Sequence, residues 1–537
     1  MAVEGRTLWE LVEARAAATP DADAAVDETG RVLTFAAYRD AAERAAAGLA
    51  EHGIGEGDVV SWQLPTWLES LVLVAALSRL GAIQNPILPI YRSAEVGFVT
   101  REAGTRLLIV PPVWRDYDFA AMAHAIAADR DDMDVLVCDR RLPDGDPATL
   151  PPPPAPASPG DLPVRWYYYT SGTTADPKGA RHTDATIDAA ARGMCEALAA
   201  DEDDRVGCVF PFTHIAGAVY VFSAMRYGCT MIVVEAFDAE TTPPLLAANG
   251  VTLAGAGTPF HMAYLAYQRA HPETAPLFPD VRAYIGGGAP KPPQLHHDIR
   301  DEMGSVGILS GYGMTEAPIV TMASVRDADD ELAHTEGKPV LDTDLRLVTI
   351  DGTVIDGPGQ EGEIRLKAPM LMRGYVDASL DDAAFDEDGY FRTGDLGTRD
   401  ERGNIAITGR VKDIIIRNME NISAKEVEDL LFSHPAIADA AVVGVPDPRT
   451  GERVCAVIVP ADSAAPPTLD DILAFTVERG LAKQKTPEQL EVVDVLPRNP
   501  TGKVLKFELN FFCNEICLGV ILDLVGHVAS GTQDVKV

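Results

Sequence analysis

A chain of 537 residues is too long for one hydrophobic core and predicts two or more domains. Its 45 Lys and Arg against 81 Asp and Glu give a net charge of −36, which argues against nucleic-acid and anionic-membrane partners because both need a basic surface. The 7 scattered cysteines, the absence of a signal-peptide pattern and the lack of a bilayer-length apolar run predict a cytoplasmic protein with reduced thiols and no stable membrane insertion.

Helix and strand patterns alternate in the first part of the chain. We expect helices at residues 34–50 and 67–80, because apolar and charged residues separate onto opposite faces there. Short apolar runs predict strands at 58–63, 107–111 and 135–138. Such alternation predicts an α/β fold with mostly parallel sheets covered by helices.

The proline-rich segment 142–163 is predicted to be an exposed connector. The alternation then resumes with predicted strands at 205–210, 231–234 and 251–254. Between residues 345 and 366 the pattern changes to short strands separated by Asp-Gly turns, which predicts a small β unit attached to the large domain.

A second, smaller α+β domain is predicted to begin near Arg410. Its expected elements are helices at 424–432 and 469–479 and strands at 438–445, 454–459 and 490–495. We therefore divide the chain into a large domain at 1–409, a small domain at 410–509 and a tail of different composition at 510–537.

The most informative segment is the loop from Tyr169 to Gly179, with the sequence Tyr-Thr-Ser-Gly-Thr-Thr-Ala-Asp-Pro-Lys-Gly. Hydroxyl groups, small residues and Lys178 together suit a site that surrounds a polyphosphate with hydrogen-bond donors. The loop differs from the common P-loop, because its lysine precedes the second glycine and Ala180 follows. An ordinary surface turn is the alternative, since the same residue types favour turns.

Four further motifs follow in order: Gly311-Tyr-Gly-Met-Thr-Glu316, Tyr390-Phe-Arg-Thr-Gly-Asp395, Gly409-Arg-Val-Lys-Asp413 and Pro497-Arg-Asn-Pro-Thr-Gly-Lys503. In this order and spacing, the five motifs resemble the adenylate-forming (AMP-binding) superfamily, in its acyl-CoA synthetase branch. The resemblance covers roughly residues 8 to 509. It implies a large domain followed by a small mobile one, and ATP, Mg²⁺ and coenzyme A as cofactors.

The resemblance implies a two-step ligase that acts on a small-molecule carboxylic acid. The carboxylate first attacks the α-phosphate of ATP to give acyl-AMP and pyrophosphate. The thiol of coenzyme A then attacks the acyl carbon and AMP leaves. Because a carboxylate is a poor electrophile, the protein's task is to hold it in line and to neutralise the phosphate charge. The resemblance leaves the oligomeric state open, with a homodimer as one option.

The resemblance also implies roles for particular residues. The expected nucleotide-binding residues are Thr170, Ser171, Gly172, Thr173, Thr174 and Lys178 at the β- and γ-phosphates, Gly287 and Gly288 along the nucleotide, Tyr312 on the adenine, and Asp395 and Arg410 at the ribose. The expected catalytic residues are Glu316 as the Mg²⁺ ligand, Thr315 at the α-phosphate, Lys503 between carboxylate and α-phosphate, and His214 in the acyl site. Read singly, each could instead be a core, turn or solvated residue.

Some details bear on the second step and on the hinge. Lys412 matches the position about which the small domain of the family rotates. Ala175 replaces a usual glycine, which should stiffen the phosphate loop slightly. Asn418 and Met419 stand where CoA ligases often have two glycines, so adenylation is better supported than thioester formation. The adjacent pair His296 and His297 faces different ways on a helix, and we interpret it as structural or solvated.

The residues after His214, from 215 to 219, are small or apolar and favour a hydrophobic acid: medium-chain, fatty or alicyclic. No aspartate near this motif could pair with a substrate ammonium, so an amino acid is disfavoured. Two other functions stay open: an adenylating enzyme that loads a carrier-protein thiol, and a non-catalytic nucleotide- or acyl-binding protein.

Overall fold

The computed structural model describes residues 2–155, 157–158, 161–170, 177–288, 291–349, 351–417, 420–447, 449–498 and 502–513. The predicted phosphate-loop residues Ser171, Gly172, Thr173 and Thr174 lie outside the described residues. So do Ala175, Asn418, Met419 and the part of the predicted tail beyond 513.

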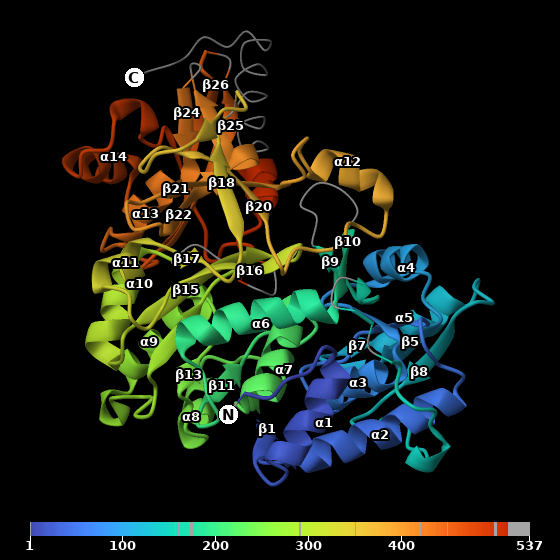
Figure 1. The fold of residues 1–537 in the computed structure, drawn as a ribbon. Helices are drawn as coiled ribbons and strands as arrows, with labels where there is room; N and C mark the ends of the chain where they lie inside the picture. The colour runs from blue at the N-terminus through green and yellow to red at the C-terminus, as the bar shows by residue number, and fades with distance from the viewer. Residues whose placement is uncertain are drawn as a thin grey trace.

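Two mostly parallel sheets form the large domain, which occupies the lower part of Figure 1. The first has nine strands, in the order β17 (Lys338–Pro339), β16 (Ala317–Met322), β15 (Ile308–Met314), β14 (Ala283–Gly286), β13 (Leu253–Ala254), β11 (Arg205–Cys208), β12 (Thr230–Val233), β1 (Asp23–Asp27) and β2 (Val32–Thr34). Its central pairs from β1 to β15 are parallel, while β2, β16 and β17 are joined antiparallel.

The second sheet has six strands, in the order β10 (Lys178–Thr183), β9 (Val164–Thr170), β4 (Ile83–Pro86), β3 (Val59–Trp62), β5 (Leu107–Val110) and β8 (Asp134–Val137). All its pairs are parallel except the hairpin of β9 with β10. A short hairpin of β6 (Val113–Trp114) with β7 (Tyr117–Asp118) lies apart from it.

Helices pack between and around these sheets. They are α1 (Leu8–Ala18), α2 (Phe35–Glu51), α3 (Leu68–Leu80), α4 (Ser93–Glu102), α5 (Phe119–Ala127), α6 (Asp184–Leu198), α7 (Ile215–Tyr227), α8 (Thr242–Ala248), α9 (Thr258–Ala270), α10 (Pro293–Asp298) and α11 (Asp329–His334). Because α3 and α6 each contact strands of both sheets, the two sheets share one hydrophobic core. Threonine side chains cap α2 and α6 and fix where these helices begin.

The predicted β unit is an antiparallel sheet of five strands: β19 (Val354–Ile355), β18 (Asp344–Val348), β20 (Gly362–Lys367), β21 (Phe391–Arg399) and β22 (Ile405–Arg410). The short helix α12 (Asp381–Ala384) lies beside it. Since β22 ends at Arg410, this sheet reaches the position at which we divide the chain.

The small domain has its own sheet and cores, at the top of Figure 1. After the 3₁₀ turn η6 (Val411–Asp413), its sheet contains β23 (Ile414–Arg417), β24 (Glu420–Ser423), β25 (Ile437–Asp447), β26 (Gly451–Pro460) and β27 (Gln489–Val492). Its helices are α13 (Ala424–Phe432) and α14 (Leu469–Glu478). The α/β fold expected from the sequence is confirmed, whereas the boundary between 409 and 410 stays a prediction.

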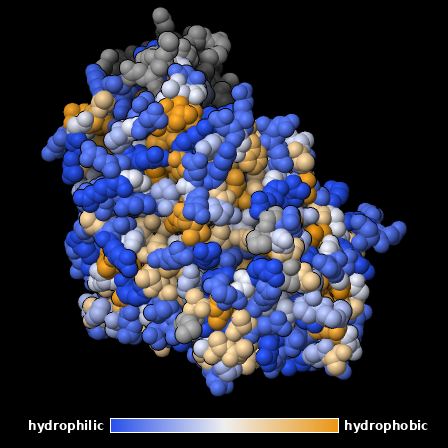
Figure 2. All heavy atoms as spheres, in the orientation of Figure 1, coloured by the Kyte–Doolittle hydropathy of each residue, from blue (hydrophilic) through white to orange (hydrophobic). Residues whose placement is uncertain are grey.

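The surface agrees with the acidic composition. Figure 2 shows a face on which polar and charged residues predominate and apolar residues are scattered. Within the part of the chain that the structure describes, no helix is both long and apolar enough to span a membrane.

Candidate functional site

A cavity of about 530 Å³ lies between the large and small domains. It is lined by Tyr312 from β15, Asp395 from β21, Arg410 from β22 and Lys503 from the small domain. These four residues come from four of the predicted motifs and from both domains. The cavity therefore brings these four predicted site residues together, whereas Thr170, Lys178, Thr315 and Glu316 do not line it.

Asp395 is a buried carboxylate in the wall of this cavity. The Tyr312 hydroxyl donates to its Oδ2 at 2.8 Å, and Arg410 Nε lies 2.9 Å from its Oδ1. The strand register explains the ion pair, because Asp395 on β21 lies directly opposite Arg410 on β22. A carboxylate held from both sides in this way has a fixed direction and can accept hydrogen bonds from two adjacent sugar hydroxyls.

Glycines open one wall of the cavity. Gly288 lines it with φ +74°, and a Cβ at this position would meet nothing within 4 Å. A ligand could therefore approach the backbone there. Gly287 has a different role, since a Cβ on it would lie 3.1 Å from the Gly311 carbonyl oxygen. Gly288 lines the cavity, whereas Gly287 is not among its lining residues. The close packing of β14 on β15 therefore explains why position 287 has no side chain.

Lys503 is presented by a loop that Arg498 organises. Arg498 pairs with Asp439 at 2.6 Å and donates from Nη1 to the Gly502 carbonyl at 2.5 Å. Burial lowers the pKa of Lys503 to about 8, repulsion from Arg410 adds to this, and attraction to Asp395 opposes it. Such a lysine is mostly protonated at neutral pH and mostly neutral at moderately alkaline pH.

This pKa predicts a pH dependence. The charged form of Lys503 decreases as the pH rises through about 8, so kcat/KM for ATP in acid-dependent pyrophosphate exchange should fall on that limb. In the Lys503→Arg variant the limb should move to much higher pH, because arginine stays protonated. Rates measured from about pH 6 to about pH 10 test this; an unchanged alkaline limb in Lys503→Arg would exclude Lys503 as the titrating group.

Glu316 lies in the turn between β15 and β16 and is half-buried. The Tyr375 hydroxyl donates to its Oε1 at 2.8 Å, and Met372 N–H donates to its carbonyl oxygen at 2.8 Å. Burial raises the pKa of Glu316, and the Tyr375 hydrogen bond and the charge of Lys178 oppose the rise. A bound cation would favour the ionised form of this carboxylate. One carboxylate together with phosphate oxygens is a donor set that suits Mg²⁺.

One stem of the predicted phosphate loop, at Lys178, lies near Glu316. Thr170 ends β9, Lys178 begins β10, and the two are paired across the hairpin. Lys178 Nζ lies 5.7 Å from the centre of the Tyr375 ring, the same tyrosine that donates to Glu316. Lys178 of the predicted phosphate loop and Glu316, the predicted metal ligand, thus both contact Tyr375.

Thr315 and His214 do not line the large cavity and instead line a small one of about 20 Å³. His182 Nε2 is 2.9 Å from the Thr315 carbonyl oxygen, which holds this turn against β10. His214 caps α7, and its Nδ1 accepts from the Ala216 N–H at 3.3 Å. Burial lowers the pKa of His214 to about 4, so the ring is neutral with its proton on Nε2.

Sequence reasoning did not identify Tyr375, His182 or the pair of Arg498 with Asp439. Tyr375 contacts Glu316 and His182 contacts Thr315 across long stretches of chain. Arg498 donates to Gly502 within its own loop and pairs with the distant Asp439. Arg498 does lie within a quoted motif, five residues before Lys503. The other two carried no signal of spacing or residue type.

Known proteins resemble this chain over nearly its whole length. Residues 12–376 match the model of the AMP-binding enzyme family, and residues 426–503 match that of the AMP-binding enzyme C-terminal domain. The chain is 33% identical over 526 residues to the salicyl-AMP ligase / salicyl-S-ArCP synthetase of Mycobacterium tuberculosis (strain ATCC 25618 / H37Rv), covering 94% of this chain and 90% of that protein.

Two further relatives span the whole architecture. The medium-chain fatty-acid–CoA ligase of Escherichia coli (strain K12) is 31% identical over 518 residues, covering 94% of this chain and 90% of the relative. The crystal structure of ATP-bound MatB from Rhodopseudomonas palustris superposes with a TM-score of 0.84 at 27% identity, covering 96% of this chain and all of that one. Both domains and their order are thus common to this chain and its relatives.

Proposed function

The chain belongs to the AMP-binding enzyme family, and on that premise we propose that it is an ATP-dependent ligase that converts a hydrophobic carboxylic acid to its acyl-CoA thioester. In the first step, a carboxylate oxygen forms a bond to the α-phosphorus and the bond to the β-phosphate oxygen breaks, giving acyl-AMP and pyrophosphate. In the second, the sulfur of coenzyme A bonds to the acyl carbon, AMP leaves with the electron pair, and the thiol proton is released.

The interdomain cavity is the observation that supports this proposal most directly. Asp395 would accept the ribose hydroxyls, and Tyr312 would pack against the adenine beside the open backbone of Gly288. Lys503 faces the same cavity and would neutralise charge on the α-phosphate and the attacking carboxylate. Because Lys503 belongs to the small domain, the rate of the first step would depend on how the two domains are arranged.

Glu316 would hold Mg²⁺, and Thr170 and Lys178 would contact the β- and γ-phosphates. When bound, Mg²⁺ supplies positive charge that neutralises the phosphate oxygens and orients the leaving pyrophosphate. Tyr375 fixes the direction of the Glu316 carboxylate through Oε1. His182 fixes the Thr315 carbonyl, so that the Thr315 backbone keeps its place beside Glu316.

The acid is proposed to be hydrophobic because α7, which follows His214, presents small and apolar residues. The His214 ring is neutral, so it offers a hydrogen-bond donor and no charge. A neutral ring among apolar neighbours suits an alkyl, alicyclic or aryl group better than a second carboxylate or an ammonium.

A carrier-protein thiol is the second candidate for the acceptor. The relative from Mycobacterium tuberculosis is named for a salicyl-S-ArCP product, whereas the relative from Escherichia coli is named for a CoA product. The adenylation step is the same for both. Free coenzyme A therefore separates the two candidates when acyl-AMP consumption is measured with and without it.

The decisive experiment is a panel of carboxylic acids assayed for AMP release with ATP and Mg²⁺, with and without coenzyme A. We expect AMP and pyrophosphate as products, with medium-chain, alicyclic or aryl acids the fastest. Formation of ADP and inorganic phosphate would contradict the proposal. Acid-dependent pyrophosphate exchange without faster AMP release on adding coenzyme A would favour the carrier-protein acceptor, and no exchange with any acid would favour a non-catalytic binding protein.

Gly502 offers a test of the domain arrangement. It has φ +82°, and a Cβ there would lie 2.4 Å from Cγ of Pro259 on α9. Gly502→Ala should therefore push the Lys503 loop off the large domain and slow pyrophosphate exchange by about 10- to 100-fold, from about 1–3 kcal/mol of strain. Gly480→Ala is the matched control, because Gly480 has φ +84° with nothing within 4 Å of a Cβ. Equal losses in both variants would rule out the steric explanation.

A further inference from the structure

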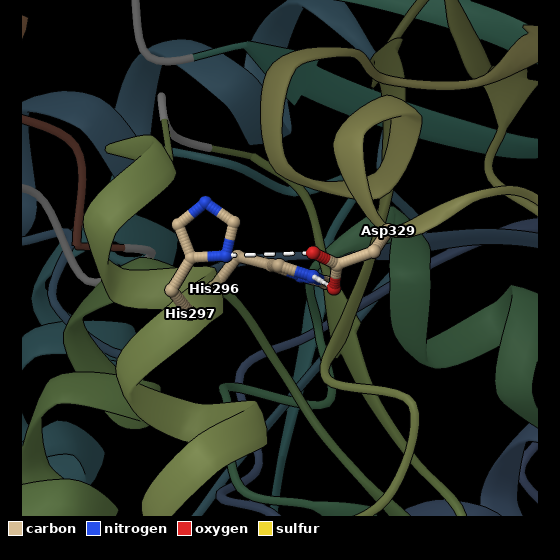
Figure 3. A group of neighbouring side chains, drawn as sticks. All are labelled: His296, His297 and Asp329. Carbon is tan, nitrogen blue, oxygen red and sulfur yellow. Dashed lines mark hydrogen bonds and ion pairs between the residues drawn. The ribbon is translucent and has the colours of Figure 1, made fainter.

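His296 and His297 on α10 and Asp329 at the start of α11 form a compact group outside the cavity, shown in Figure 3. One ligand atom from each lies within 4.8 Å of the others. His296 Nε2 is 3.1 Å from Asp329 Oδ1, and His297 Nδ1 is 3.7 Å from Asp329 Oδ2. Tetrahedral bonds of about 2.0–2.1 Å place neighbouring ligand atoms roughly 3.4 Å apart, so these spacings suit a single metal ion.

The two histidines converge although they are adjacent on a helix. Adjacent side chains leave a helix about 100° apart, and the rings compensate by using different nitrogens. The buried His296 ring reaches the carboxylate with its distal Nε2, and the half-buried His297 ring turns its nearer Nδ1 toward the same group. The two imidazoles thus point toward one carboxylate from two directions.

The His296 ring is also held as a metal ligand would be. Its Nδ1 lies 3.3 Å from the Ile308 carbonyl oxygen, a partner that can accept a proton from Nδ1 and leave the Nε2 lone pair for a cation. In the other tautomer, with the proton on Nε2, Nδ1 accepts from the Ile308 N–H at 3.1 Å and Nε2–H donates to Asp329. Gly307 packs against the ring, since a Cβ there would lie 2.7 Å from Cε1 of His296.

His297 is the less satisfied of the two. Its Nδ1 is buried and has no hydrogen-bond partner among the described residues, with only the 3.7 Å approach to Asp329. A buried nitrogen without a hydrogen bond is costly, and a cation placed between it and the carboxylate would satisfy it.

We propose that His296, His297 and Asp329 bind one divalent cation of the zinc class, with water as a fourth ligand. Two imidazoles and one carboxylate are the ligand types that zinc takes in sites with an open position. Imidazole favours zinc, nickel and copper over magnesium, so this site is distinct in chemistry from the Mg²⁺ role proposed for Glu316.

Arg300 is the competitor that the cation must displace. Its guanidinium forms an ion pair with Asp329 and also with Asp301, the latter at 2.7 Å. When Asp329 turns to a metal, Arg300 keeps Asp301 as a partner. Arg300 thus lowers the affinity of the site for a metal ion. Its ion pair with Asp301 remains when the metal binds.

Metal at this site would join α10 to α11. The carbonyls of Leu332 and Ala333 near the end of α11 accept from the buried Lys291, and the chain continues to Glu336, which lines the interdomain cavity. A cation that ties α11 to α10 should therefore stabilise the large domain and leave the nucleotide-binding groups in place.

The test uses the full chain, stripped of metal with a chelator and titrated with Zn²⁺ by calorimetry and by thermal unfolding. We expect one site, with affinity at least about tenfold weaker in His297→Ala and in Asp329→Asn. Arg300→Ala should bind more tightly than the parent, because the competitor is gone. Mg²⁺ should produce no comparable shift of the unfolding midpoint.

His124→Ala, which removes an exposed histidine on α5, is the matched control and should bind as the parent does. Circular dichroism shows whether each variant is folded. Equal Zn²⁺ affinity in the parent and His297→Ala would overturn the proposal. An unchanged affinity in Arg300→Ala would overturn it as well, since the site would then not involve Asp329.

Discussion

Replacing Lys503 by alanine is expected to lower acid-dependent pyrophosphate exchange by about 10²- to 10³-fold, the usual cost of losing one group that stabilises developing charge. The side chain faces the cavity that Asp395 and Arg410 also line, so its cation lies where carboxylate and α-phosphate charge would meet. Thioester formation from supplied acyl-AMP should largely survive, because the carboxylate charge that Lys503 would neutralise has been consumed in forming the bond to the α-phosphorus.

The comparison needs two controls. Lys485→Ala removes another small-domain lysine, one that pairs with Glu426 at 2.7 Å and does not line the cavity, and should leave both steps within about twofold. Lys503→Arg keeps the charge and should retain part of the exchange activity. Equal loss of both half-reactions in Lys503→Ala would contradict a role confined to adenylation.

Glu316→Gln should be nearly as damaging, with a loss of about 10²-fold or more in pyrophosphate exchange at saturating ATP. The amide keeps the shape of the side chain, and its carbonyl can still accept from Tyr375, but the negative charge is gone. The variant should also need a much higher Mg²⁺ concentration for half-maximal activity. That shift distinguishes a lost cation ligand from a disturbed turn.

Tyr375→Phe provides the graded comparison, since it leaves the Glu316 charge and removes the hydroxyl that orients it. We expect a smaller loss, about tenfold, from one hydrogen bond to a charged group. If Glu316→Gln kept the parental Mg²⁺ dependence, the carboxylate would have a structural role and the metal assignment would be wrong.

Local patterns predicted the elements well where one face is buried and one is solvated. The helix expected at 424–432 is α13, which begins after the Ser423 cap and has the expected bounds. The strand expected at 107–111 is β5, one residue shorter, and all of its residues are buried. Such agreement follows from periodicity, which burial imposes on short segments without reference to the rest of the chain.

Tertiary contacts were beyond the reach of these patterns. Nothing in the spacing indicated that Tyr375 would meet Glu316, or that His182 would hold the carbonyl of Thr315. The pair His296 and His297 was interpreted as structural or solvated from helix geometry, which does not tell which ring nitrogen reaches out or what approaches from α11. The roles of the predicted site residues themselves stay predictions.

Arg410 is both the last residue of β22 and the partner of Asp395, and η6 follows it at once. The strand that leads into the small domain is therefore held at its end by an ion pair in the wall of the interdomain cavity. A substitution of Arg410 would remove this ion pair and change the wall of the cavity at the same time. A change in ATP affinity in such a variant would therefore reflect both the cavity wall and the connection between the domains, and the same holds for Lys412, which lines the cavity as well.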